Sequence, residues 1–353
     1  VSADNNLGDN SNTVEFTGGT LNATSSFTLD NNRTVDFSTG GGTIDVDAGE
    51  TLASTANNQL VGSGSLTKVG DGTLRVTNTN QSFSGGLIVN DGTYLADTTG
   101  NLTIGGSGNS ILGAGSVTVD GPSALLDVDT TGDIAYNRDT FIDNGGTVRL
   151  SPGPPYGDVI SDLDGRFTFG AGGGVLDLDG FVDEVPLNLT TNADAATPAI
   201  VRYGTITNSG SQGGWPANSS LQLNGGLDAG AIDDVVRFEL TNGALVEQRN
   251  GQTNFNGTLV ISGQPGGDPS VGSFSTDVGR WALIEDGTYS YDGGIFFEDT
   301  TQFTIFNGTR TVDADLTVRD GGIVAFQGRS TGSNNQDPLV LGTTVNDNTL
   351  LVE

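Results

Sequence analysis

Short runs in which polar and apolar residues alternate recur along the whole chain, and Gly, Asn, Asp and Ser separate them. Residues 60–97 show the pattern most clearly, with runs at 65–69, 73–76, 87–89 and 93–95. Alternation with a period of two is typical of strands that bury one face, whereas a helix would repeat every three or four residues. The pattern therefore predicts β-strands joined by tight turns.

Strands of three to five residues are too short to be stable alone, so they need stacked neighbours that share one core. Glycine permits the positive φ or close backbone approach that sharp corners require. In this stretch the corner glycines are Gly64, Gly70, Gly72, Gly85, Gly86 and Gly92. We therefore expect these residues to form coils of a β-solenoid.

The corner pattern also occurs earlier, as Gly-Gly-Thr at residues 18–20 and 41–43. Leu21 and Ile44 occupy like places in these copies, and Leu74 and Tyr94 follow in the central stretch. Intervals of roughly twenty to thirty residues fit one coil of three strands and three corners.

The phrase GSGSLTKVGDGTLRVTNTNQSFSGGLIVNDGTYL resembles the passenger-associated repeat of bacterial autotransporter proteins. In that repeat a GxGxLxKxGxGTLxL segment leads through a Thr/Asn-rich, aromatic turn into GGxxVxxGTL. This chain departs from it at Arg75, Val76 and Tyr94. The matching positions are Gly62, Gly64, Leu66, Lys68, Gly70, Gly72, Thr73, Leu74, Phe83, Gly85, Gly86, Val89, Gly92 and Thr93.

The resemblance implies a right-handed parallel β-helix that is exposed on, or released from, a bacterial cell. Its repeats carry no catalytic residues that could be transferred to this chain. Together with the strand pattern, this predicts an all-β fold, a right-handed parallel β-helix (β-solenoid), whose C-terminal part is β-rich but less regular.

Three prolines between residues 151 and 158 interrupt the strand pattern, because proline cannot donate a ladder hydrogen bond. We expect residues 1–150 to form the β-helix with autotransporter-like repeats. Residues 151–158 are either a linker or an outward loop. Residues 159–353 then continue the solenoid or form a second β-rich domain.

The chain has 353 residues and a net charge of −30, with 56 glycines and no Cys, Met or His. Such an acidic excess repels phosphate backbones and anionic membranes, so we expect neither nucleic acid binding nor membrane insertion. No apolar run of about twenty residues is present. With no initiator Met and no signal segment, we expect a mature, secreted chain at the cell surface or outside it.

Without His and Cys, the chain alone cannot form a Ser-His-Asp triad, a Cys-His pair or a His-based zinc site. Carboxylates remain, and three pairs place two Asp residues at i and i+2 around an aliphatic residue. On a strand both acids then share one face, which is either a solvated outer surface or a calcium site built from these acids and turn carbonyls. The calcium candidates are Asp45, Asp47, Asp127, Asp129, Asp177 and Asp179.

Two carboxylates suffice for glycoside hydrolysis, so a carbohydrate-active enzyme on a β-helix is the enzymatic alternative. Its acids would come from the clusters at 158–164 or 177–184. The sequence does not identify two carboxylates at the distance that glycoside hydrolysis requires. We therefore expect that the chain is not an enzyme.

Aromatic residues are more frequent after residue 221, where they either thicken the core or form a face for another subunit. The sequence shows no polar helix or charged cap at either end, and it closes on a strand-like stretch. Uncapped strands leave hydrogen-bonding groups that can pair with another molecule. We therefore expect an extracellular structural protein that assembles head-to-tail with itself into a fibre or surface layer.

Two alternatives to the fibre remain open. One is a monomeric adhesin stalk within an autotransporter passenger, with a cell-surface or matrix polysaccharide as a further partner. The other is the carbohydrate-active enzyme.

Overall fold

The computed structural model describes most of the N-terminal half of the chain and separate segments of the rest. The described residues are 1–105, 109–153, 159–163, 165–179, 181–182, 185–186, 188–193, 196–203, 221–223, 227–229, 234–240, 245–248, 252–263, 279–283, 287–306, 310–319, 323–329 and 350–352. These residues are almost entirely β-strands, and their only helical segment is one 3₁₀ turn, η1 (Asp4–Leu7).

The chain divides into two compact units. Unit 1 comprises Val1–Thr168 and Gly174–Leu176, and unit 2 comprises Phe169–Gly173 and Asp177–Glu353. The strands β19 (Arg166–Phe169) and β20 (Gly174–Leu178) contain residues of both units.

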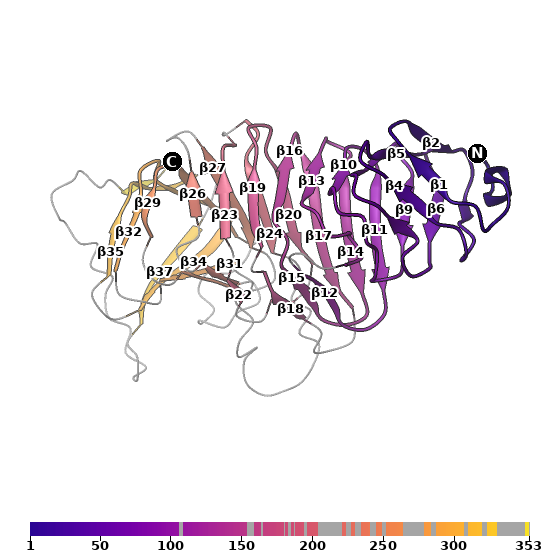
Figure 1. Cartoon of the computed structure of the whole chain (residues 1–353). Coiled ribbons are helices and arrows are strands. Elements are labelled where there is room, and N and C mark those ends of the chain that lie inside the picture. Colours follow the sequence, from indigo (N-terminus) through magenta and orange to yellow (C-terminus); the bar gives the residue numbers. More distant parts are fainter. Residues whose placement is uncertain are drawn as a thin grey trace. The chain divides into compact units, whose positions relative to one another are not determined.

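Each coil of unit 1 contributes strands to two sheets that run along the solenoid (Figure 1). The long sheet contains, in order, β3 (Phe27–Thr28), β6 (Thr51–Ser54), β9 (Thr73–Val76), β11 (Thr93–Thr98), β14 (Leu125–Thr130) and β17 (Gly146–Pro152). The second sheet contains β2 (Thr20–Ala23), β5 (Gly42–Val46), β8 (Leu66–Val69), β10 (Leu87–Val89), β13 (Val117–Asp120) and β16 (Thr140–Asp143).

Two shorter sheets close the third side of unit 1. The first contains β1 (Val14–Phe16), β4 (Val35–Phe37) and β7 (Leu60–Val61), and the other contains β12 (Leu102–Ile104), β15 (Ile134–Tyr136) and β18 (Val159–Asp162). The pairings between the described strands are parallel, and one coil spans about 21 residues between Leu66 and Leu87 and about 30 between Leu87 and Val117.

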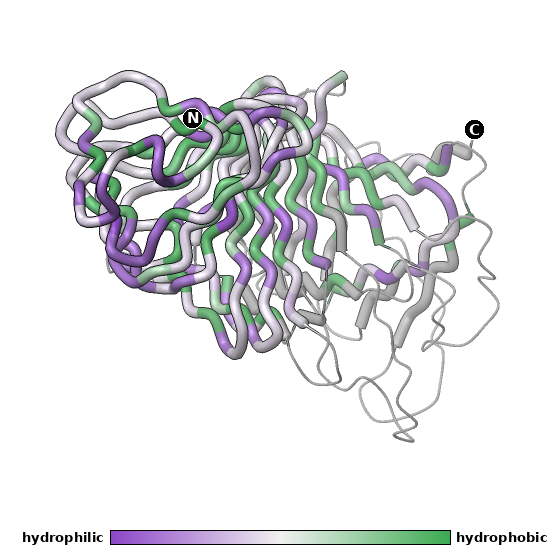
Figure 2. The backbone as a smooth tube through the Cα atoms, turned by 90° about the vertical axis from the view of Figure 1, so that its right-hand side faces the viewer, coloured by the Kyte–Doolittle hydropathy of each residue, from purple (hydrophilic) through white to green (hydrophobic). Residues whose placement is uncertain are grey.

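The core of unit 1 is a set of columns in which one inward residue of each coil stacks on its partner in the next. The long sheet supplies one such column, and its members are fully buried: Leu52, Leu74, Tyr94, Leu126 and Val148. Burial of each large apolar side chain contributes about 1.5–3 kcal/mol. In Figure 2 hydrophobic and hydrophilic residues alternate along neighbouring coils of this unit.

Aromatic rings also stack between coils of unit 1. The rings of Phe16 and Phe37 lie parallel with centroids 5.2 Å apart, and Phe83 meets Phe37 edge-on at 6.0 Å. Such pairs add about 0.5–1.5 kcal/mol beyond the area they bury.

Unit 2 is built in the same way from the described strands. One sheet contains β24 (Ala199–Tyr203), β27 (Val235–Leu240), β30 (Thr258–Ser262), β33 (Ile295–Glu298), β36 (Leu316–Val318) and β38 (Leu350–Val352). Another contains β22 (Val185–Pro186), β25 (Leu221–Leu223), β28 (Leu245–Gln248), β31 (Gly279–Leu283), β34 (Thr300–Phe306) and β37 (Ile323–Arg329). The remaining strands are β21 (Phe181–Val182), β23 (Asn188–Thr191), β26 (Leu227–Ala229), β29 (Gln252–Phe255), β32 (Gly287–Tyr291) and β35 (Arg310–Asp313).

The core of unit 2 contains larger side chains. Phe238, Ile261 and Phe297 are register partners on β27, β30 and β33 and are fully buried. Trp281 meets Phe238 edge-on at 5.1 Å, and Phe303 meets Phe297 edge-on at 5.4 Å. These described aromatic residues thicken the core, which is one of the two alternatives expected for them.

The predicted all-β parallel β-helix is confirmed. The four strands expected in residues 60–97 are present as β8, β9, β10 and β11, with small differences in their ends. The strands β15 and β16 were not predicted, because Asn and Asp surround short apolar segments there and hide the alternation.

One prediction about the repeats needs correction. Leu21 and Ile44 are register partners on the second sheet, as expected. Leu74 and Tyr94 are also partners, but they lie on the long sheet, and the partner of Ile44 in the next coil is Lys68. A Gly-rich corner followed by Thr occurs before strands of both sheets, so the motif alone does not identify the position in the coil.

The expectation that neither end carries a cap is wrong at the N-terminal side. Residues 1–13 lie beside the first strands, with η1 held there by a hydrogen-bonded ion pair between Asp4 and Arg33. The two residues are far apart in the sequence, so no local pattern reveals the cap. The proline-rich residues 154–158 lie outside the described residues, and the expected boundary at 151–158 stays a prediction.

Close packing of the corners generates a stability prediction for Gly64. A Cβ atom at this position would lie 1.9 Å from the carbonyl oxygen of Ser38 and 2.5 Å from the backbone nitrogen of Gly41 in the neighbouring coil. We expect Gly64→Ala to lower the free energy of unfolding by about 1–3 kcal/mol, because the coils must move apart. Urea denaturation followed by circular dichroism measures the change.

The matched control is Gly105→Ala, since a Cβ there would meet no atom within 4 Å. This substitution should change the free energy of unfolding by no more than about 0.5 kcal/mol. Equal effects of the two substitutions would contradict the tight corner at Gly64.

Candidate functional site

The three Asp pairs lie on outward faces, as the strand pattern predicts. The aliphatic residue inside each pair, Val46, Val128 or Leu178, is fully buried. Asp47 and Asp129 are exposed, and Asp45 and Asp127 are half-buried. Asp177 departs from the expected solvated surface, because it is only 7% exposed.

The structure places these pairs on different strands rather than in one site. Asp45 lies on β5 of the second sheet and Asp127 on β14 of the long sheet, whereas Asp177 belongs to β20. In the described part of the chain, no group of three or more acidic residues is arranged to hold a metal ion. Calcium binding therefore stays a prediction.

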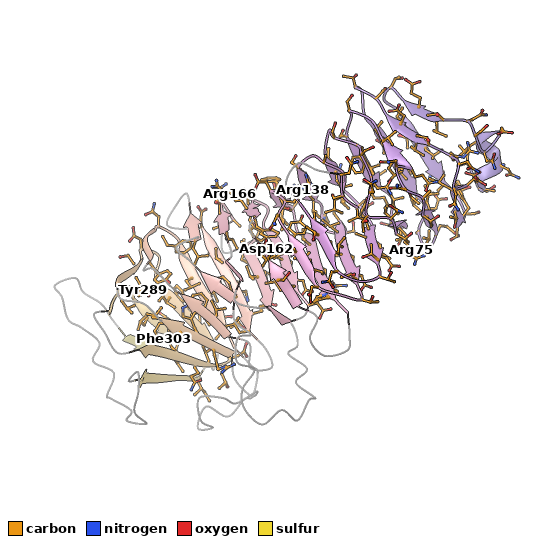
Figure 3. All side chains as sticks on the ribbon, turned by 60° about the horizontal axis from the view of Figure 1, so that its bottom comes forward. Arg75, Arg138, Asp162, Arg166, Tyr289 and Phe303 are labelled. Atoms are coloured by element: carbon orange, nitrogen blue, oxygen red, sulfur yellow. The ribbon has the colours of Figure 1, made fainter. Side chains whose placement is uncertain are left out.

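Neighbouring coils supply donors to several of these acids. Asn22 donates to Asp47 at 2.9 Å, and Arg149 forms an ion pair with Asp127 at 3.8 Å. On the long sheet, Arg75 donates to Asp97 of the next coil at 2.7 Å. Arg75 is labelled in Figure 3. These contacts join adjacent coils, so they explain part of the acidic pattern without a ligand.

The clusters proposed for glycoside hydrolysis are only partly described. Asp158, Asp164, Asp183 and Glu184 lie outside the described residues. Asp162 is half-buried and accepts a hydrogen bond of 2.9 Å from Asn137 of the preceding coil.

The outer face of the long sheet in unit 1 is mostly short and polar. Thr51, Thr73 and Thr93 form a register column of half-buried hydroxyl side chains. The column beside it contains Arg75 and Leu95. The column of small hydroxyl side chains and the ion pairs between neighbouring coils hold adjacent coils together at this outer face.

Lys68, the only lysine, lies inside the solenoid. Its side chain stands between Ile44 and Val89 in an inward column and is fully buried. Its Nζ donates to the carbonyl oxygens of Val69, Gly70 and Asp91, at 2.8, 2.6 and 3.2 Å. Burial lowers the pKa of Lys68 to about 8, although Asp91, Asp45 and Asp71 act in the opposite direction.

Sequence reasoning missed this inward lysine, although the signal was present. Alternation within β8 puts Lys68 on the same face as Leu66, and Leu66 is a core residue. The lysine connects the corner after β8 with the corner of the next coil, so its role is structural.

A second group that the sequence did not reveal comprises buried polar side chains at the corners of unit 1. The amide of Gln81 accepts from Leu60 N at 2.8 Å and donates to Ala56 O at 3.1 Å. Arg138 is 2% exposed and donates to the carbonyl oxygens of Gly113 and Ala114. These side chains satisfy backbone groups at corners where no regular ladder does so.

Unit 2 has an ionic cluster on its outer face. Glu298 is 7% exposed and accepts from Arg237 at 2.5 Å and from Arg319 at 2.8 Å. The guanidinium of Arg319 also lies over the ring of Phe296, 4.4 Å from its centroid. The cluster joins β27, β33 and the residue after β36.

Comparison with known proteins gives one partial match. The chain is 34% identical over 93 residues to the adhesin BmaC autotransporter of Brucella suis biovar 1 (strain 1330), and the match covers 26% of this chain. It covers 3% of the length of that adhesin. No family model matches the sequence, and no solved structure matches the chain.

The partial match and the β-helix fold loosely support the similarity to autotransporter proteins that the repeat pattern suggested. Membership of the passenger-associated repeat family stays a prediction. No helix in the described segments is long and apolar enough to cross a membrane.

The lowered pKa of Lys68 predicts how stability depends on pH. Between pH 8 and about 10.4 the unfolded chain binds a proton that the folded chain has lost, so the free energy of unfolding should rise with pH in this window. The rise should be roughly 1–3 kcal/mol, from 1.36 kcal/mol per pKa unit. Urea denaturation at a series of pH values measures it.

Lys68→Met removes the proton and keeps most of the side-chain volume, so the rise should be absent in this variant. Burial raises the pKa of Tyr94 and Tyr136, which makes stability fall above about pH 10 in both proteins. The difference between the two proteins isolates the lysine. An identical pH profile in both would contradict the buried lysine.

Proposed function

We propose that this chain is a segment of the stalk of a bacterial surface adhesin, and that it acts as a stiff, durable spacer. The observation that carries the proposal is the continuous parallel register of the long sheet in unit 1, in which Leu52, Leu74, Tyr94, Leu126 and Val148 form one buried column. The partial match to an adhesin autotransporter supports the same function.

Stiffness follows from the way in which the coils are joined. Each strand pairs with the strands of the coils before and after it, so bending a unit must stretch ladder hydrogen bonds and separate core columns at once. Cross-coil contacts such as Arg75 to Asp97 and Asn22 to Asp47 add to this resistance.

Charge and composition suit the same role. A net charge of −30 keeps copies of the chain apart in solution and favours a solvated surface. The absence of Cys and Met removes the side chains that are most easily oxidised outside a cell.

We further propose that the chain belongs to the passenger-associated repeat proteins and acts at the bacterial cell surface. We also propose that it contacts surface or matrix polysaccharide through its outer faces. Residues 60–97, which carry the repeat pattern, contain the strands β7 to β11, and this supports membership of that family.

Two other functions receive less support. Assembly into a fibre through the chain ends stays a prediction. Catalysis on polysaccharide would need two carboxylates at a working separation. Several described acids, among them Asp97, Asp127 and Asp162, pair with donors from neighbouring coils, which favours a non-catalytic role.

Surface display tests the spacer function. The chain is placed between an outer-membrane anchor and a peptide tag on a laboratory bacterium that carries long surface polysaccharide. We expect an antibody to reach the tag, because a stiff solenoid holds it beyond the polysaccharide. Flow cytometry with the labelled antibody measures access.

A flexible Gly/Ser linker with the same number of residues is the matched control, since such a chain folds back on itself. It should leave the tag largely hidden. Equal access with the flexible linker would refute the spacer function. Release of reducing ends from polysaccharide by the displayed chain would favour the enzyme.

A further inference from the structure

The chain contains no Cys and no Met, so the side chains that oxidise most easily are absent from it. Asparagine followed by glycine is a different kind of labile pair. In such a pair the backbone nitrogen of the glycine attacks the side-chain amide of the asparagine, and glycine has no Cβ atom to hinder the approach. The sequence of unit 1 contains one such pair, Asn144-Gly145.

Asn144 and Gly145 form the corner between β16 and β17 (Figure 1), and both residues are exposed. Asn144 has a φ of 50° and Gly145 a φ of 83°, so two successive residues adopt the left-handed region. In this described corner the backbone nitrogen of Gly145 donates no hydrogen bond. No bond of this nitrogen therefore has to break before it can react.

Two carboxylates hold Asn144 in this conformation. Its side chain crosses to the preceding coil, where Nδ2 donates to Asp120 Oδ1 at 2.7 Å. Its backbone nitrogen donates to Asp143 Oδ1 at 2.9 Å. Asp120 and Asp143 are register partners on β13 and β16, and both are half-buried. The asparagine thus donates hydrogen bonds to two acids that lie on the same outer face.

A second asparagine of unit 1 has the same backbone conformation but a different neighbour. Asn58 is exposed and also has a φ of 50°. The residue after it, Gln59, is 1% exposed, and its Oε1 accepts from Ser54 Oγ at 2.9 Å. The carbonyl of Gln59 also accepts from Val35 N at 2.8 Å. Gln59 cannot move its backbone nitrogen toward Asn58 without breaking this packing, so Asn58 is an internal control.

We propose that Asn144-Gly145 is a site of spontaneous deamidation, and that Asp120 slows the reaction by holding the side-chain amide of Asn144. Water is the only co-reactant. The nitrogen of Gly145 loses its proton and bonds to Cγ of Asn144, while the bond from Cγ to Nδ2 breaks. Nδ2 takes up a proton and leaves as ammonia. Water then opens one of the two C–N bonds of the cyclic imide, which leaves aspartate or isoaspartate at position 144.

The hydrogen bond to Asp120 opposes ring closure, because the side chain of Asn144 has to turn from the preceding coil back toward Gly145. The site therefore reacts only when the corner opens locally.

The product disturbs the corner in two ways. A carboxylate replaces the amide that donated to Asp120, so two acids repel each other at hydrogen-bond distance. Isoaspartate also adds one carbon to the main chain immediately before β17, which is paired with β14 of the preceding coil. The modification thus loosens the ladder at one corner. This inference goes beyond the spacer function, because it concerns how long the corner keeps its covalent structure.

The test incubates the full folded chain at neutral and at mildly alkaline pH and follows it by peptide mapping with mass spectrometry. We expect aspartate and isoaspartate to accumulate at position 144, and faster at the higher pH, because the nitrogen of Gly145 has to lose a proton. Asn58 should stay unmodified. Asp120→Ala should accelerate the reaction about threefold to tenfold, because a hydrogen bond to a charged group no longer restrains the amide. Asp97→Ala is the matched control, since it removes an acid on β11, two coils before β17, and should leave the rate unchanged.

The effect of the product is measured separately with Asn144→Asp, which reproduces the aspartate form. We expect a lower urea midpoint than in the wild-type chain at neutral pH, because the new carboxylate faces Asp120. The difference should disappear below about pH 4, where the carboxyl groups are protonated. Asn58→Asp is the matched control and should keep the wild-type midpoint at both pH values, since no described acid accepts a hydrogen bond from the Asn58 side chain.

Three results would overturn the proposal. Position 144 could stay unmodified in the folded chain while the urea-denatured chain reacts, which would show that the fold protects the pair. Asn58 could be modified as fast as Asn144, which would remove the role of the neighbouring glycine. Asp120→Ala could also react no faster than the wild-type chain, which would show that Asp120 does not restrain the amide.

Discussion

The structure depends on the parallel backbone ladder that joins each coil to the next in exact register. A coil of short strands has too little apolar surface to fold alone, and its core is completed only when the same positions of neighbouring coils meet. The corner glycines make this register possible. At Gly64 the backbone of one coil lies so close to Ser38 and Gly41 of another that no Cβ fits between them.

Polar side chains support the ladder wherever its regular pattern stops. Lys68 donates to three carbonyls of two successive corners, Gln81 bonds backbone groups of its own and the preceding coil, and Arg33 holds the 3₁₀ turn η1 beside the first strands. Each of these groups is buried and hydrogen-bonded, which avoids the cost of an unsatisfied polar group.

The sequence predicted the fold well where alternation and corner glycines occur together. It located β8 to β11 and the outward faces of Asp45 and Asp127, because strand periodicity alone decides which face a residue occupies. It failed for Arg33 and Asp4, since their contact depends on how coils stack and not on any local pattern. Lys68 could have been found from its place on the same face of β8 as Leu66, but a lysine is rarely assigned to a core.

The most direct measurement of the register is disulfide formation between engineered cysteines in a chain that has none of its own. Thr73 and Thr93 are outward-facing partners in adjacent coils, about 4.8 Å apart, within the range of a disulfide. Residues 73 and 95 are offset by two positions, and their Cα atoms are about 8 Å apart. We expect the Thr73→Cys, Thr93→Cys chain to form an intramolecular disulfide readily and the Thr73→Cys, Leu95→Cys chain not to. Preferential closure of the offset pair, or equal rates for both, would contradict the stacked register.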